Sequence, residues 1–390
     1  MKQKIFLIVL LIGVLFHANA QNSGKTIGCN DDSSINRNYS KAASLQAVMN
    51  KYTALGLPGL SMSIYTEKEG WWAGAAGYSD IEKKTAMEIC HLQYLQSVSK
   101  TYMAVAILKL HEEGKIDFDA PMTKYLPSKY AKYIRDAEKI TVRMLLNHTS
   151  GVAEYSIHPQ FTSFVIEHPL TNFSAEDCLK SISKEGLQFT PGSKFKYTNT
   201  NYQLLSLIGD AITGDHSEYI RKNIFETLDL RSSYYSNNHN YLKRLPLTES
   251  YWDMLNVGEP SNVSGFQQVN VSSLKGDDGI VSTPLDVTRF LKSLMEGKLL
   301  SPASMKEMME FVKNEEGKPK YGMGIFYYDL GGIIGYGHSG GGIGAGCIML
   351  YIPVLKTYLF LATNLGVLVD GELSKKANDL QMEILTTIAQ

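Results

Sequence analysis

The most apolar helical pattern in the chain covers residues 101–110, where Lys109 is the only strongly polar side chain. A helix that is apolar on every side belongs inside a protein. Polar residues gather at its ends: Ser97 and Lys100 stand before it, and Gly114 follows it, where a glycine typically closes a helix. The pattern therefore predicts a buried helix with a serine and a lysine at its N-terminal tip.

Hydrophobic periodicity divides the rest of the chain into strand-like and helix-like segments. Strand patterns cover residues 60–66, 71–78, 321–328, 347–352 and 357–363, and helix patterns cover 42–55, 141–147, 201–212 and 373–389. Strands near both ends with helices between them favour an α+β fold. We expect one domain over residues 21–390, with an antiparallel sheet built from both termini and flanked by helices. This α/β lobe would comprise about 40–115 and 275–390, and about 116–274 would form an inserted, mainly helical lobe.

The first twenty residues have the pattern of a secretory signal peptide. Lys2 and Lys4 precede an apolar run over residues 5–16, and residues 18–20 (Ala-Asn-Ala) form a small-x-small cleavage site. A run of that length is too short to span a bilayer. We therefore expect an exported chain, periplasmic or secreted, that begins near Gln21 and has no stable membrane insertion.

Charge and cysteine content exclude several classes of partner. The 390 residues carry 38 basic and 39 acidic side chains, a formal net charge of −1, which offers no extended positive surface for nucleic acid. The spacing of the four cysteines matches no zinc motif. We expect no nucleic-acid partner, no metal and no cofactor. Cys178 and Cys347 have apolar neighbours and are expected to be free buried thiols, whereas the state of Cys29 and Cys90 stays open.

Ser97 and Lys100 are spaced for covalent chemistry. Residues three apart lie on the same face of a helix, and the positive N-terminal end favours a deprotonated hydroxyl. A lysine beside such a serine could activate it as a nucleophile. The same spacing also arises when a serine caps a helix and a lysine reaches solvent, and it recurs at Ser181–Lys184 and Ser272–Lys275. The buried helix behind Ser97 distinguishes it from these copies.

A second candidate segment carries Tyr197 and Asn199 after a Pro-Gly turn. Residues two apart in an extended segment point the same way. A phenolate could act as a general base, and an amide could hold a substrate carbonyl. A structural turn would explain the segment equally well, because Tyr-x-Asn also occurs at residues 235–237.

A third segment, residues 335–342, contains His338 and Ser339 among five glycines. Glycines would let the backbone approach a ligand and leave N–H groups free as oxyanion donors, although a glycine-rich turn is the simpler interpretation. The pattern around Ser339 also fits the Gly-x-Ser-x-Gly nucleophile elbow. That elbow requires a histidine after the serine, and the last histidine of the chain is His338. The elbow is therefore excluded.

In this order the three segments resemble the serine β-lactamase and penicillin-binding protein group of hydrolases: class C β-lactamases, DD-carboxypeptidases and related esterases. The resemblance covers most of the chain and includes residues 114–121, 124–127, 140–151, 191–199, 276–286, 321–324, 338–341 and 362–364. It implies a catalytic group of Ser97, Lys100 and Tyr197, a substrate-binding group of Asn199, His338, Ser339 and Gly340, and an oxyanion hole formed by the N–H groups of Ser97 and Gly341. It also implies that His148 is a structural turn residue.

The third motif departs from the β-lactamase pattern, because His338 stands where these enzymes carry a lysine that steers the substrate carboxylate. A histidine is largely neutral at pH 7. We therefore expect a small-molecule or peptide substrate, cleaved as by a DD-peptidase, a D-amino-acid peptidase or an esterase, with weak β-lactam hydrolysis. A class C β-lactamase and a non-hydrolysing sensor of peptidoglycan fragments or β-lactams are the alternatives. The leaving group, the choice of Lys100 or Tyr197 as base, and the oligomeric state stay open.

Overall fold

The computed structural model describes residues 33–236, 241–244 and 246–390. The predicted signal peptide and Cys29 lie outside these residues. The main sheet has nine strands in the order β3-β2-β1-β14-β13-β12-β11-β10-β9, and every pairing is antiparallel. The strands are β1 (Gly59–Thr66), β2 (Gly70–Asp80), β3 (Thr85–Ala86), β9 (Val312–Lys313), β10 (Pro319–Tyr321), β11 (Phe326–Asp329), β12 (Ile334–Gly341), β13 (Gly346–Ile352) and β14 (Thr357–Thr363). The α+β fold with a sheet from both ends of the chain is confirmed.

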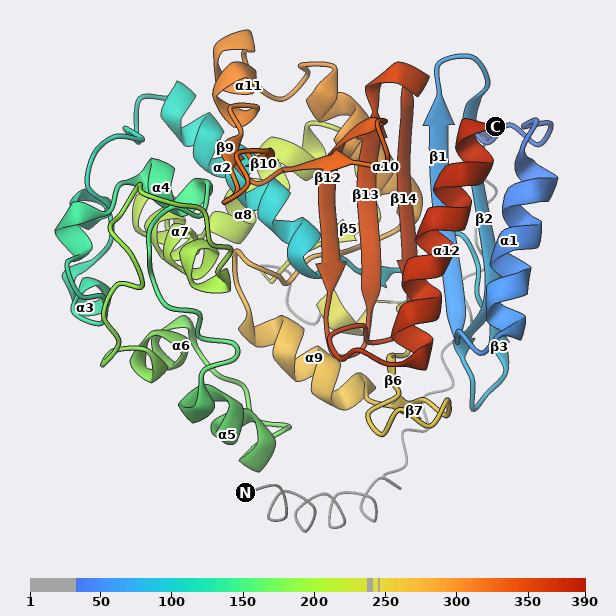
Figure 1. The fold of residues 1–390 in the computed structure, drawn as a ribbon, viewed down its shortest axis with the longest axis horizontal. Coiled ribbons are helices and arrows are strands. Elements are labelled where there is room, and N and C mark those ends of the chain that lie inside the picture. The colour runs from blue at the N-terminus through green and yellow to red at the C-terminus, as the bar shows by residue number, and fades with distance from the viewer. Residues whose placement is uncertain (1–32, 237–240, 245) are drawn as a thin grey trace.

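Helices cover both faces of the sheet. Figure 1 shows α12 (Glu372–Ala389) across one face, beside α1 (Ala42–Ala54), while α2 (Ser99–Glu112) reaches the sheet from the helical lobe. Side chains alternate between the two layers, as the pleat of a strand requires. Leu350 of β13 packs in the cluster with α1 and α12, and its neighbour Met349 packs in the larger cluster with α2.

The predicted buried helix is α2, whose residues from Ser99 to Leu108 are all buried. Burying one large aliphatic side chain stabilises a fold by about 1.5–3 kcal/mol. Hydrophobic burial therefore fixes α2 in the centre of the molecule, and the helix holds its polar N-terminal tip at the boundary between the sheet and the helical lobe.

The helical lobe and its connections contain most of the remaining elements. The helices are α3 (Ser128–Ala131), α4 (Val142–Leu146), α5 (Pro159–Glu167), α6 (Ala175–Ser181), α7 (Asn199–Thr213), α8 (His216–Ile220), α9 (Ser264–Ser273), α10 (Pro284–Met295) and α11 (Pro302–Met308). Short strands form two further sheets: β4 (Gln93–Tyr94), β8 (Val281–Ser282) and β5 (Ser233–Tyr234) in one, β6 (Tyr251–Trp252) and β7 (Ser261–Asn262) in the other.

Two local predictions and one alternative interpretation differ from the structure. The single strand predicted over residues 321–328 is two strands, because the chain reverses between β10 and β11, where Gly324 has a φ of +76°. The glycine-rich segment is strand β12 rather than a turn, since its residues 336–341 pair with β13. Helix α7 begins at Asn199, two residues before the predicted start.

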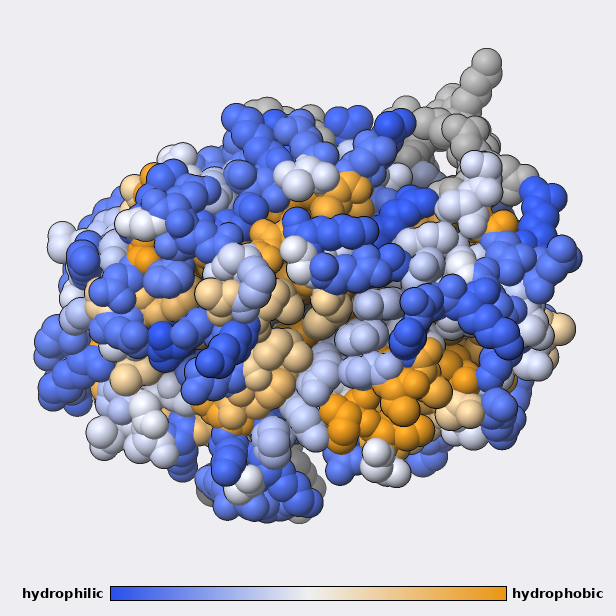
Figure 2. Space-filling model, turned by 90° about the horizontal axis from the view of Figure 1, so that it is seen from above, coloured by the Kyte–Doolittle hydropathy of each residue, from blue (hydrophilic) through white to orange (hydrophobic). Residues whose placement is uncertain are grey.

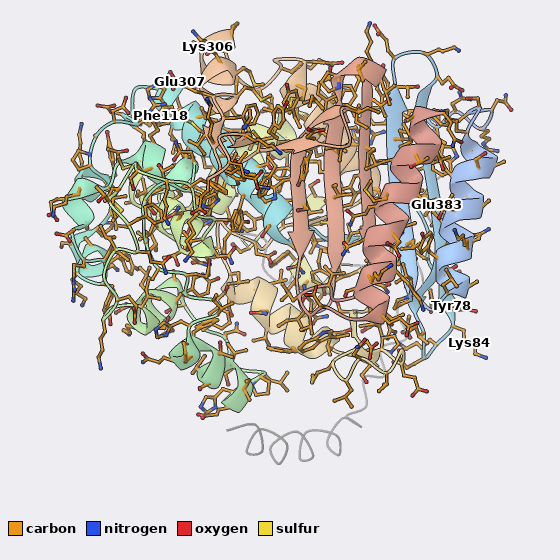
Figure 3. The ribbon with its side chains drawn as sticks, viewed as in Figure 1. Tyr78, Lys84, Phe118, Lys306, Glu307 and Glu383 are labelled. Atoms are coloured by element: carbon orange, nitrogen blue, oxygen red, sulfur yellow. The ribbon has the colours of Figure 1, made fainter. Side chains whose placement is uncertain are left out.

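Polar contacts at the surface fasten neighbouring elements. In Figure 3, Glu383 of α12 lies on the side of α1, where Lys51 Nζ and the Tyr52 hydroxyl donate to its carboxylate at 2.6 and 3.0 Å.

The face seen from above in Figure 2 is mostly hydrophilic, with hydrophobic residues in separate patches. Among the described helices, none combines the length and apolarity needed to cross a membrane.

The predicted state of two cysteines is confirmed. Cys178 and Cys347 are buried free thiols, as expected from their apolar neighbours. Cys90 is disulfide-bonded.

Candidate active site

Ser97 lies in a short 3-10 turn, Gln96–Val98, that leads directly into α2. Residues three apart are eclipsed in a 3-10 helix, so Ser97 and Lys100 still share a face. Lys100 Nζ donates to Ser97 Oγ at 2.8 Å. The preceding residue, Gln96, has a φ of +48°, an uncommon conformation for a residue with a side chain. The turn thus presents Ser97 at the tip of a rigid, buried helix.

Lys100 is 0% exposed, and its ammonium has few partners. Besides Ser97, it donates to the backbone carbonyl oxygen of Asp277 at 2.7 Å. Its Nζ also lies 5.3 Å from the ring centroid of Tyr197 and 5.9 Å from that of Tyr202, so two aromatic faces surround the charge. Lys100 is therefore held in one position beside the candidate nucleophile.

Tyr197 reaches Ser97 from the loop that precedes α7. The turn at His148 fixes this loop, since the Lys196 N–H donates to the His148 carbonyl at 2.9 Å and the Thr198 N–H donates to His148 Nδ1 at 3.3 Å. The ring centroid of Tyr197 lies 5.3 Å from Lys100 Nζ, and Lys100 in turn donates to Ser97. Burial raises the pKa of Tyr197, whereas the Lys100 charge pulls it down. Tyr197 is therefore placed to exchange a proton with Ser97.

Strand β12 approaches the nucleophile turn from the other side. A β-carbon on Gly340 would lie 2.5 Å from the Leu95 carbonyl oxygen and 2.9 Å from Gln96 Cβ, so only glycine fits there. Pairing of β12 with β11 ends at Gly337, while pairing with β13 continues to Gly341. One backbone edge of residues 338–341 is thus unpaired beside Ser97. The N–H of Gly341, at the end of this edge, stays the predicted oxyanion donor.

His338 is buried next to these groups and has no free nitrogen. Its Nδ1 lies 2.6 Å from the Ser339 carbonyl oxygen, which can only accept, so we assign the ring proton to Nδ1. Nε2 then accepts a hydrogen bond of 3.0 Å from the Tyr321 hydroxyl. Burial, followed by the Lys100 charge, lowers the pKa of His338 to about 3. The His338 ring is therefore neutral at physiological pH.

A family model described as beta-lactamase matches residues 45–381. The chain belongs to the beta-lactamase family. Penicillin-binding protein 4* of Bacillus subtilis (strain 168) is 26% identical over 300 residues, which is 73% of this chain and 64% of that protein. Protein flp of Staphylococcus aureus (strain MRSA252) is 28% identical over 190 residues, 48% of this chain and 36% of that protein. The chain thus spans less than two thirds of the length of these curated relatives.

Solved structures give the same fold. A D-stereospecific amidohydrolase from Streptomyces sp. superposes with a TM-score of 0.74 and 26% identity, covering 86% of this chain and 97% of that one. The D-amino acid amidase from Ochrobactrum anthropi SV3, complexed with L-phenylalanine amide, has a TM-score of 0.76 and 24% identity and covers 89% and 98%. The chain therefore shares the fold of these enzymes as well as the family of its curated relatives, and its resemblance to penicillin-binding proteins is confirmed.

The remaining predicted site residues differ in their exposure and in their contacts. Asn199 is the first residue of α7, and its side-chain amide donates to Ser156 Oγ at 3.3 Å. Ser339 and Gly341 are exposed, while Gly340 is buried against the nucleophile turn. The substrate contacts of Asn199, Ser339 and Gly340 stay predictions.

The other serine-lysine copies have local roles. The hydroxyl of Ser181 donates to the Cys178 carbonyl at 2.6 Å, and that of Ser272 donates to the Val269 carbonyl at 2.9 Å. Each bond lies within one helical turn, so neither serine has the lysine partner that Ser97 has. Tertiary structure thus separates the candidate nucleophile from its copies.

Sequence reasoning missed two groups at this site. Tyr321 fixes the tautomer of His338, and Asp277 provides the carbonyl acceptor for Lys100. A signal for the second was present, because Asp277 and Asp278 stand together between glycines, just before an apolar strand. The side chain of Asp277 is buried and points to two further donors, which are described below.

One acidic-histidine cluster occurs among the described residues: Asp210, Asp215 and His216. His216 Nδ1 lies 2.6 Å from Asp210 Oδ1, and its Nε2 lies 3.0 Å from the Tyr235 hydroxyl. Both ring nitrogens are thus engaged with protein groups. The cluster joins α7 to α8 and offers no imidazole nitrogen to a metal.

Proposed function

We propose that this hydrolase is an exported amidohydrolase that cleaves amide bonds of D-amino acid derivatives through an acyl-enzyme on Ser97. The observation that carries the proposal is the state of His338. In the β-lactamase pattern a lysine at this position steers the substrate carboxylate. Here the ring is neutral and both of its nitrogens are occupied. A substrate that lacks a carboxylate at this point, such as an amino acid amide or an ester, therefore suits the site better than a penicillin.

The positions of the side chains support a covalent route. Ser97 Oγ attacks the amide carbon, and its proton passes to Lys100, which hydrogen-bonds to it, or to Tyr197, whose ring lies beside Lys100. The N–H groups of Ser97 and Gly341 stabilise the oxyanion. The same proton then reaches the departing amine nitrogen as the C–N bond breaks. Water hydrolyses the resulting ester of Ser97 and regenerates the hydroxyl.

Two further observations support the choice of substrate and location. The Streptomyces structure that shares 26% of its residues with this chain is described as a D-stereospecific amidohydrolase. The signal-peptide pattern of residues 1–20 and the disulfide at Cys90 fit an oxidising compartment outside the cytoplasm. D-amino acid derivatives occur in peptidoglycan, which is exposed in that compartment.

The test compares D- and L-amino acid amides, a D-Ala-D-Ala peptide, a p-nitrophenyl ester and a β-lactam as substrates of the purified protein. We expect turnover of D-amino acid amides and of the ester, a preference for D over L, and slow β-lactam hydrolysis. Ser97→Ala should reduce turnover at least about 10⁴-fold. Ser272→Ala removes the serine of a second Ser-x-x-Lys sequence and should keep full activity, because its hydroxyl bonds only within α9.

Two results would contradict the proposal. Efficient penicillin or cephalosporin turnover would favour a β-lactamase. Stoichiometric acylation of Ser97 without turnover, read as a stable mass increase of the intact protein, would favour a sensor of β-lactams or peptidoglycan fragments.

A further inference from the structure

Two consecutive buried acids lie beside the lysine of the active site. Lys100 Nζ donates to the carbonyl oxygen of Asp277, and the side chains of Asp277 and Asp278 belong to residues that are only 2% and 7% exposed. Acidic side chains are rarely buried to this degree unless they are paired. The segment is therefore built to place carboxylates next to the Lys100 charge.

Two neutral donors from the helical lobe hold the Asp277 carboxylate. The Tyr155 hydroxyl donates to Oδ2 at 2.8 Å, and Gln203 Nε2 donates to Oδ1 at 2.7 Å. A hydrogen bond to each oxygen favours the ionised form, but neither donor carries a charge. Burial raises the pKa of Asp277 to about 6, and Lys100 is the strongest influence that lowers it. The compensating charge for this carboxylate is thus Lys100.

The buried ammonium of Lys100, in turn, lacks a negatively charged group in direct contact. Its direct acceptors, Ser97 Oγ and the Asp277 carbonyl, are both neutral, and an unpaired buried ammonium is costly. The carboxylate and the ammonium are connected through the backbone of Asp277 rather than by direct contact. This arrangement supplies a counter-charge and still leaves the Lys100 protons directed at Ser97.

We propose that Asp277 is a positioning residue of the hydrolase, whose buried carboxylate is the counter-ion of the Lys100 ammonium and sets the pH range in which Ser97 is activated. The inference rests on the proposed acyl-enzyme chemistry of Ser97. It does not depend on whether Lys100 or Tyr197 takes the serine proton, because the Asp277 charge acts on both groups.

Other ionisable groups face this pair and enter the pH dependence. Those facing Asp277, besides Lys100, are Glu154, Tyr155, Cys178, Tyr197, Tyr235 and Asp278. Lys100 also faces His148 and His338, and burial lowers the pKa of both histidines so that they stay neutral. Burial and the Asp277 charge raise the pKa of Asp278 to about 7. Asp277 is therefore the acid of the pair that stays ionised at neutral pH.

The test is the pH profile of Ser97 acylation by a fluorophosphonate probe, measured by intact mass in the full-length protein. Asp277→Asn has nearly the same shape as the native side chain, and its amide would find an acceptor in Gln203 Oε1, which has no partner now. We expect the profile of this variant to move to lower pH by about one unit or more, because deprotonation becomes easier without the carboxylate. Asp278→Asn is the matched control, because it makes the same substitution one residue away. It should move the pH profile by less than Asp277→Asn does.

A second variant separates charge from structure. Tyr155→Phe removes one hydrogen bond that lowers the pKa of Asp277 but keeps its carboxylate. We expect its profile to follow the wild type at pH 8 and to approach that of Asp277→Asn at pH 6, where the carboxyl takes up a proton. A uniform loss of rate with no change in the shape of the profile would show a purely structural role.

Three outcomes would decide against Asp277. An unmoved profile in Asp277→Asn, confirmed as folded by its thermal unfolding, would overturn the inference. Equal shifts in Asp277→Asn and Asp278→Asn would also overturn it, since net charge alone would explain them. Wild-type protein that is labelled at Ser97 but hydrolyses no amide contradicts only the proposed function, whereas unlabelled wild type contradicts both.

Discussion

Gly340 lies so close to Leu95 that a β-carbon on the glycine would come within 2.5 Å of the Leu95 carbonyl oxygen. This approach brings the edge of β12 against the turn that carries Ser97. Gly340→Ala should therefore push the oxyanion donors away from the nucleophile. A displacement of about 1 Å at a reacting centre costs on the order of 100-fold in rate, so we expect at least this loss in Ser97 acylation.

The control for this substitution is Gly265→Ala in α9. A β-carbon there would lie 3.5 Å from Leu170 Cδ2, an ordinary contact. Acylation of this variant, measured with the same probe, should match the wild type. Unchanged acylation in Gly340→Ala would show that β12 tolerates a larger separation from the nucleophile turn.

His338→Lys should change substrate preference. A lysine at this position would offer a cation to a substrate carboxylate, which the neutral histidine does not. We expect the ratio of benzylpenicillin acylation to p-nitrophenyl ester acylation to rise at least about tenfold. Thermal stability should fall, because the bond from Tyr321 is lost and a second cation is buried near Lys100.

His338→Gln controls for this change, because it is polar but uncharged and should not raise the ratio. If both variants favour penicillin equally, the preference depends on the size of the side chain and not on its charge.

Asp278→Asn should stabilise the protein, and more so at high pH. Burial and the charge of Asp277 raise the pKa of Asp278 to about 7, whereas an unfolded aspartate titrates near 3.9. Between these values the unfolded state ionises while the native state keeps its proton, so the free energy of unfolding falls as the pH rises from about 4 to about 7. The variant escapes this loss and keeps the oxygen that accepts the Gly279 N–H.

Urea denaturation at pH 4.5 and pH 8 measures this effect. We expect the stability gain of Asp278→Asn over the wild type to be larger at pH 8, by an amount of order 2 kcal/mol. Parallel stability curves for the two proteins would mean that Asp278 ionises equally well in the folded and unfolded chain.

Cys178 and Cys347 should both be unreactive in the native protein. Burial raises the pKa of both Cys178 and Cys347, and the nucleophilic form is the thiolate. Iodoacetamide should leave both cysteines unmodified in the folded protein. After unfolding without a reductant, peptide mapping should find both of these cysteines alkylated and Cys90 protected by its disulfide. Alkylation of Cys347 in the folded protein would show that the β12–β13 region opens in solution.

Several elements were predictable because their side chains follow one period. The apolar run of α2, the alternation in β13 and β14, and the amphipathic pattern of α12 each agree with the layer that they occupy. The strand predicted over residues 321–328 was wrong, because its apolar alternation continues through a turn. Gly322 and Gly324 make that turn: a β-carbon on Gly322 would lie 2.1 Å from the Met308 carbonyl oxygen. This contact joins two separate segments, so the local pattern of residues 321–328 could not predict it.

The sequence by itself determined the buried helix behind Ser97, the sheet from both ends of the chain, and the three short motifs that resemble one family. These features depend on local periodicity and on spacing within single segments. Only the tertiary structure decided which serine pairs with a lysine, that both nitrogens of His338 are occupied, and that Asp277 lies beneath Lys100. The hydrogen bond from Lys100 to Asp277 joins residues 177 positions apart, and in all three cases burial in a common interior, which no local pattern encodes, fixes the hydrogen bonds and the charge states.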